Sequence, residues 1–259
     1  MFHITLRRLV VLVGVTAALL VASAAPILAQ PPAAAAPPAP PPPDWTGSVN
    51  FGMALTVGNN DTVNANGVYE VKYDPKKKNV FKTSGLFLYG ETEGETTAEQ
   101  YVLTFRDEYA INARVFVFGD FRYLHDRFKG ISYMVAPTGG IGYKLVDLPA
   151  TKLGVGIGGG GVWEKDYGFE TNSSGALTFD EKVTHKLTET ATVGQSFLAL
   201  WKTSDFEDAL YSFSANFAVA INKRAQLKVE LLDTYKNKLQ DVTLKKNDLS
   251  LIVGVVFKF

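Results

Sequence analysis

The sequence predicts an all-β fold, a membrane-spanning, up-and-down antiparallel β-barrel of about 12 strands. Three observations predict it. Segments with period-two alternation follow one another along the chain, and the amino terminus has the layout of an export signal. The last segment, 248–259, alternates up to a terminal phenylalanine, and its apolar face is made of Leu249, Leu251, Val253, Val255, Phe257 and Phe259. We expect this face to contact lipid, with Phe257 and Phe259 as the membrane-assembly signal.

The amino terminus predicts export and a spacer. Arg7 and Arg8 precede an apolar run over 9–20, and small residues follow, so 1–29 reads as a secretory signal peptide. The alternative is an anchoring helix, but the run reaches only residue 25 and is short against the ~20 residues of a membrane span. Residues 30–43 are almost entirely Pro and Ala and predict an extended spacer. Residues 44–259 are left for the barrel.

Composition excludes several classes of site and partner. The chain has no cysteine, which rules out a disulfide framework and a thiolate metal site. It holds 26 basic and 26 acidic residues, and two of the basic ones lie in 1–43, so the expected mature part carries 24 against 26. This balance gives no reason to expect nucleic acid as a partner. No apolar run after residue 25 is long enough for a membrane helix.

Most of the alternating segments have about 11–14 residues, which exceeds an ordinary strand of ~5–6 and suits a tilted transmembrane strand. Asp107 interrupts the apolar face of its segment between Phe105 and Tyr109, and the pattern offers no reason for it. The predicted strands are 46–57, 63–73, 79–89, 98–111, 114–125, 131–144, 151–164, 177–187, 191–202, 208–221, 225–235 and 248–259.

Alternation alone also fits a soluble periplasmic barrel or sandwich, which would place the apolar face inward. Large aromatic residues near both ends of the apolar faces, an even strand count and connections that alternate between short and longer favour the membrane barrel. The short connections would face the periplasm, and the protein would lie in the cell outer membrane. The longer connections include 90–97, 166–176 and 236–247.

The opposite faces predict a lumen lined by charges of both signs. Such charges could pair and close the interior, giving a structural barrel, or line a narrow water path. Twelve strands fall between the filled 8-strand barrel and the open 16-strand porin, so size does not decide. The residues predicted to line the lumen are Glu70, Lys72, Arg106, Glu108, Asp120, Arg122, Lys144, Lys228 and Glu230.

Evidence for catalysis is confined to one pair. His125 and Asp126 lie together at the external end of the fifth segment, where an outer-membrane hydrolase could place a rim active site. No G-x-S-x-G motif accompanies them, so we expect no enzyme. A third alternative is a binding platform on the outer loops.

Other motifs are weaker. Residues 58–61 and the acidic loop with Glu91, Glu93 and Glu95 could attract a hard cation but lack calcium-loop spacing, so we predict no metal and no cofactor. The glycine-rich run 154–161 lies inside a strand pattern, which argues against a phosphate loop and for one lumen wall with little side-chain volume.

Several stretches, in order and spacing, resemble the outer-membrane family catalogued as domain of unknown function 481, which includes salt-induced outer-membrane proteins. They are 45–49, 56–60, 126–131, 139–145 and the closing strand to Phe259. The resemblance covers essentially 45–259 and implies a barrel, a link to salt or osmotic stress, and no established reaction. The partners we expect are outer-membrane lipid, lipopolysaccharide and the barrel-assembly machinery; the oligomeric state stays open.

Overall fold

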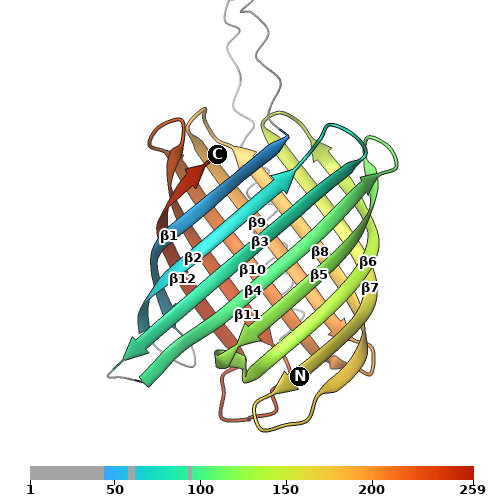
Figure 1. Cartoon of the computed structure of the whole chain (residues 1–259), viewed down its shortest axis with the longest axis vertical. Helices are drawn as coiled ribbons and strands as arrows, with labels where there is room; N and C mark the ends of the chain where they lie inside the picture. The colour runs from blue at the N-terminus through green and yellow to red at the C-terminus, as the bar shows by residue number, and fades with distance from the viewer. Residues whose placement is uncertain (1–43, 58–61, 93–94) are drawn as a thin grey trace, which may run out of the picture. The chain divides into compact units, whose positions relative to one another are not determined.

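The computed structural model describes residues 44–57, 62–92 and 95–259, which form one closed antiparallel barrel (Figure 1). Each strand pairs with its neighbours in the sequence, and β1 closes the sheet against β12. The predicted fold class is confirmed. The strands are β1 (Trp45–Val57), β2 (Thr62–Tyr73), β3 (Asn79–Thr92), β4 (Glu95–Ala110), β5 (Val115–Asp126), β6 (Ile131–Asp147), β7 (Thr151–Asp166), β8 (Asn172–Lys186), β9 (Ala191–Lys202), β10 (Asp205–Ala220), β11 (Ala225–Lys236) and β12 (Asn247–Lys258).

The strands extend further than predicted at one end. β4 begins at Glu95 and β8 at Asn172, where the alternation predicted 98 and 177. These polar ends keep pairing with the preceding strand, so backbone hydrogen bonds continue where the side-chain pattern stops. The outer loops are therefore shorter than predicted, which weakens the binding-platform alternative. Among the described residues, no helix is long and apolar enough to cross a membrane.

The connections that follow β2, β4, β6, β8 and β10 have three to five residues each and lie at the same end of the barrel as the carboxyl terminus (Figure 1). Two of them share one hydrogen-bond pattern. The Asn112 side chain accepts from the backbone N–H of Arg114 and of Val115, and Asn222 accepts from the two corresponding residues of its own turn. Asn favours such turns because its side chain can replace a backbone acceptor. We call this end the turn end and the opposite end the loop end.

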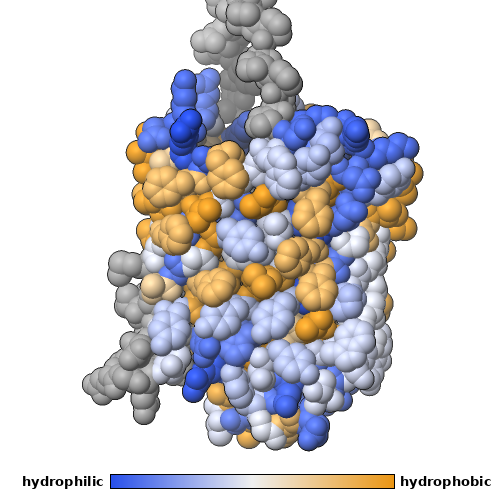
Figure 2. Space-filling view, viewed as in Figure 1, coloured by the Kyte–Doolittle hydropathy of each residue, from blue (hydrophilic) through white to orange (hydrophobic). Residues whose placement is uncertain are grey.

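The apolar face of each strand points outward. Phe51 and Ile157 are each 66% exposed, as expected for side chains that lipid would cover. Figure 2 shows hydrophobic side chains over the middle of the wall and hydrophilic ones toward its two ends. Aromatic pairs lie near both ends of this face. The rings of Trp45 and Tyr73 are 4.6 Å apart, and Trp201 Nε1 donates to the hydroxyl of a tyrosine on β10 at 3.0 Å.

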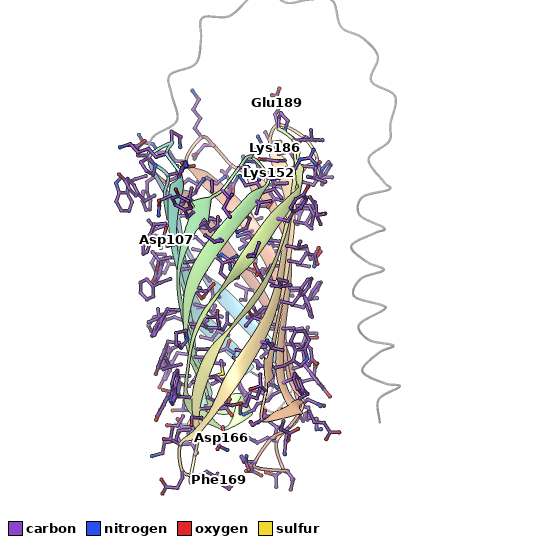
Figure 3. All side chains as sticks on the ribbon, turned by 90° about the vertical axis from the view of Figure 1, so that its right-hand side faces the viewer. Asp107, Lys152, Asp166, Phe169, Lys186 and Glu189 are labelled. Atoms are coloured by element: carbon purple, nitrogen blue, oxygen red, sulfur yellow. The ribbon has the colours of Figure 1, made fainter. Side chains whose placement is uncertain are left out.

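Asp107, which the sequence left unexplained, has a partner on this outer surface. The side-chain amide of Asn79 on β3 donates to both of its carboxylate oxygens, at 3.2 and 3.1 Å. Figure 3 shows Asp107 on the outside of the wall, toward the turn end that carries Lys186 and Glu189. A position near the membrane edge makes an outward carboxylate much less costly than one at mid-depth.

Candidate functional site

The interior of the barrel holds a group of charges centred on Arg106 of β4. Its guanidinium pairs with Glu108 on the same strand at 3.0 Å and with Asp120 on β5 at 3.2 Å. A third pair joins it to Asp180 on β8 at 3.3 Å. Because β4 and β8 are not neighbours in the sheet, this pair crosses the lumen. Lys82 on β3 extends the group by binding the second oxygen of Glu108 at 2.6 Å.

The Arg106 group depends on glycines in β6 and β7. The guanidinium carbon of Arg106 lies 3.8 Å from the centroid of the Phe118 ring, a cation–π contact. That ring occupies space that a β-carbon on Gly140 or Gly158 would need, and Asp180 does the same beside Gly156. The sequence predicted a lumen wall with little side-chain volume here, and the structure shows that bulky neighbours occupy the space this leaves. The glycine-rich wall has no phosphate-loop geometry, since these glycines lie within paired strands.

A second group of charges crosses the lumen toward the loop end. One oxygen of Glu164 on β7 accepts from Lys202 of β9 at 3.0 Å and from Lys236 of β11 at 2.6 Å. Lys236 also lies 3.4 Å from Asp166, whose position near the loop end is visible in Figure 3. Lys202 pairs in addition with Asp208 at 2.7 Å. β7 and β11 are not adjacent, so this network joins separate parts of the wall.

The connection between β5 and β6 folds inward at the loop end of the barrel. It contains a short 3-10 helix, η1 (Arg127–Lys129), which begins after Asp126, whose side chain accepts from the backbone N–H of Lys129 at 3.2 Å. Gly130 follows in the left-handed region, with φ 69°, where a residue lacking a β-carbon is favoured. The ammonium of Lys129 is fully buried and pairs with Asp248 on β12 at 2.7 Å. η1 is thereby fixed to a strand far from its own in the sheet.

Apolar side chains fill the lumen beside these charges. Leu124 on β5 and Leu210 on β10 belong to one buried cluster, so it reaches between separate strands. Next to it lies a cavity of about 170 Å³, and a smaller one of about 50 Å³ adjoins the Arg106 group. The larger cavity is lined by Val68, Glu70, Ser84, Gly85, Leu86, Gln100, Val102, Thr104, Arg122, Leu124, Leu210, Ser212, Leu232 and Thr234.

The residues predicted to line the lumen fall into three places. Arg106, Glu108 and Asp120 lie together in the group described above. Glu70 and Arg122 line the larger cavity. The third set lies elsewhere along the lumen.

In this third set, Lys228 and Glu230 pair with each other at 2.7 Å on β11. Lys72 pairs with Asp74 in the β2–β3 turn at 2.7 Å. Lys144 lies near the turn end, 3.8 Å from an aspartate at the end of β6. These four residues therefore take no part in the two groups that cross the lumen.

Sequence reasoning missed several residues of the two lumen-crossing groups. Asp180 and Glu164 lie inside the predicted strands 177–187 and 151–164 at inward positions, so the alternation pointed to both although neither was chosen as a lumen residue. Lys236 lies just past the predicted end of its strand. Lys129 carried no periodic signal because it lies in a 3-10 turn.

The structure does not bring His125 and Asp126 together as a rim active site. Successive residues of a strand point to opposite faces, and Asp126 is directed inward, where it accepts from Gln100 at 2.6 Å. His125 Nδ1 lies 2.7 Å from the carbonyl oxygen of Ser132, and its Nε2 lies 3.6 Å from Glu99. A general base and its orienting acid need a shared hydrogen bond, which this pair lacks. The cation-loop idea at 58–61 lies outside the described residues, as do 93–94 of the acidic loop.

The family described as "Protein of unknown function, DUF481" matches residues 49–259. The chain belongs to the DUF481 family. No curated protein matches it. Among solved structures, the DUF481 chain resembles a NanC porin with a TM-score of 0.56 and 10% identity, over 82% of this chain and 100% of the porin.

It also resembles the COG4313 outer membrane channel from Pseudomonas putida F1, with a TM-score of 0.51 and 12% identity, over 85% of this chain and 97% of the channel. At these identities the likeness shows the fold alone. The DUF481 chain thus has the fold of outer-membrane porins and channels, which fits a channel or a structural barrel.

Proposed function

We propose that this protein is a non-enzymatic, narrow channel of the cell outer membrane, closed in its resting state mainly by ion pairs across the lumen. The observation that supports this most is the pair between Arg106 and Asp180, which lie 3.3 Å apart although their strands are not neighbours in the wall. Long charged side chains can reach across a twelve-strand lumen, as those of Arg106 and Asp180 do, and can therefore close it. An ion pair between flexible side chains can separate without unfolding the strands that carry it.

Single-channel conductance in a planar bilayer tests the proposal. The wild-type protein should give small or infrequent steps, and Arg106→Ala should give larger and more frequent ones. Lys223→Ala in the exposed β10–β11 turn serves as the charge-matched control and should match the wild type. Folding of each variant is checked by heat-dependent gel mobility.

Two results would contradict the proposal. Wild-type steps as large as those of an open general porin would mean that the ion pairs do not close the lumen. A folded Arg106→Ala protein that stays silent would favour the second candidate, a structural barrel. The apolar cluster around Leu124 and Leu210 is the observation that favours that candidate.

The link to salt or osmotic stress is a separate proposal that rests on the resemblance. Growth of a deletion strain in high-salt medium tests it, with complementation by the wild-type chain. A strain that grows as well as its parent under every osmotic condition would remove the link.

A further inference from the structure

Arg122 on β5 is a lumenal cation without an ion-pair partner. No acidic group of the described residues lies within 4.0 Å of its guanidinium, and its Nε is buried with no hydrogen-bond acceptor. The neighbouring acid on the same strand, Asp120, pairs with Arg106 instead. Leaving a buried guanidinium donor unsatisfied is costly, so an anion or water is expected to complete it.

The surroundings of Arg122 define what would fit. The cavity of about 170 Å³ that it lines is apolar on several sides, with Leu86, Leu124 and Leu232 among the lining residues. The same cavity holds the hydroxyls of two serines and two threonines, which can accept or donate hydrogen bonds. A ligand with one charged end and a short hydrocarbon part would satisfy both kinds of surface.

Glu70 limits the charge of the ligand. It lines the same cavity from β2 and, within the described residues, has no cation within 4.0 Å. Its register runs Glu70 to Ser84 to Thr104 to Arg122 across four adjacent strands. At ~4.8 Å per strand, the two charged residues are ~14 Å apart along the wall, so they face the cavity from two sides. A second carboxylate on the ligand would be repelled by Glu70.

The turn end would supply such an anion. Lys182, Lys186 and Lys258 share the inward parity of their strands, and within the described part of the chain none has an acidic group within 4.0 Å. Unpaired positive charges that line a low-dielectric passage attract anions into that passage. These lysines are outside the cavity and bring anions near it without selecting among them.

From these observations we propose that the cavity beside Arg122 binds a short-chain monocarboxylate, with the carboxylate on the guanidinium and the hydrocarbon part against the leucines. This deepens the proposed channel function by naming the class of solute, and it rests on that function for its physiological meaning. Binding can nevertheless be measured on the closed barrel, without any current.

Titration calorimetry on the folded protein in detergent is the test, with sodium butyrate as the probe. Butyrate should bind, while butyramide, its neutral isostere, and succinate, a dianion, should bind at least about tenfold more weakly. Arg122→Gln should lower butyrate affinity by at least about tenfold, and Arg122→Lys by less, because it keeps the charge but loses the bidentate geometry. Lys223→Gln, in the exposed β10–β11 turn, is the charge-matched control.

A second variant keeps the test decisive if Arg122→Gln does not fold. Glu70 is exposed and lines the cavity, so Glu70→Gln should fold and should raise succinate affinity by about tenfold, a larger gain than for butyrate, which carries one carboxylate fewer. Equal binding of butyramide and butyrate, or chloride displacing butyrate at equal concentration, would overturn the proposal. Butyrate binding by a protein that gives no current in the bilayer would reject the channel proposal and support the monocarboxylate site. Conductance without butyrate binding would reject the site and support the channel.

Discussion

The guanidinium carbon of Arg106 lies 3.8 Å from the ring centroid of Phe118. The side chain that reaches across the lumen therefore packs on an aromatic ring of the adjacent strand. The ring has room because β6 carries Gly140 where other strands carry side chains. The ion pair that crosses the lumen thus depends on residues with no charge of their own. The same contact limits which substitutions the glycine wall tolerates.

Gly140→Ala should destabilise the barrel by about 1–3 kcal/mol or more, because the new β-carbon would clash with the carbonyl oxygen of Ile157 and with the Phe118 ring. Urea unfolding in detergent measures the loss. Gly119→Ala is the matched control, since its β-carbon would meet no atom within 4 Å. Equal stability of the two variants would show that the glycine wall is not tightly packed.

Breaking the Lys129–Asp248 pair should cost about 3–5 kcal/mol, because Lys129→Met leaves a buried carboxylate without its cation. The double variant Lys129→Met/Asp248→Leu should recover most of this loss, since it removes both buried charges. Chemical unfolding of the three proteins gives the comparison.

The exposed pair between Lys238 and Asp205, at 2.6 Å, provides the control for that experiment. Lys238→Met should change the free energy of unfolding by less than about 1 kcal/mol, because solvent screens this pair. A Lys129→Met loss no larger than this would mean that η1 is not held by its ion pair.

Asp74, in the β2–β3 turn, predicts a small pH dependence at low pH. The hydrogen bond from the Lys72 ammonium lowers the pKa of its carboxyl from 3.8 to about 2, against the opposing effect of partial burial. The pair therefore stabilises the folded state fully above pH ~4, and the contribution is lost as pH falls through about 2. The difference in unfolding free energy between wild type and Asp74→Asn should shrink over that interval. A difference that is constant from pH 6 to 2 would contradict the shift.

Phe259→Ala should lower the fraction of protein assembled in the outer membrane of cells, if the terminal residue is an assembly signal as the sequence predicts. Phe259 also exchanges two backbone hydrogen bonds with Gly47, each 3.1 Å, which join β12 to β1. The substitution keeps these bonds, so refolding of the purified protein in detergent should be unchanged. Reduced refolding in vitro would assign the residue to the seam of the barrel instead.

Much of the architecture could be predicted from the sequence because apolar and polar residues alternate along each strand. Alternation in 248–259 or in β10 gives the strand and the face that points outward. Connections of a few residues between long strands leave little choice but antiparallel neighbours, and Asn112 and Asn222 mark two of these turns directly. The sequence alone thus determined the barrel, its strand order and which face of each strand points outward.

The tertiary structure decided which lumenal charges meet. The side chains of Arg106 and Asp180 come from strands 74 residues apart in numbering, and no local pattern records that barrel closure places them 3.3 Å apart. The same holds for Glu164 with Lys236 and for Lys129 with Asp248. Alternation reports only the face of a side chain, whereas contact across a lumen depends on barrel diameter, strand tilt and shear, which are properties of the closed sheet. Arg122 and Arg106 carry the same inward signal in the sequence. Only the fold shows that the guanidinium of Arg122 has no ion-pair partner among the described residues and lies beside a cavity.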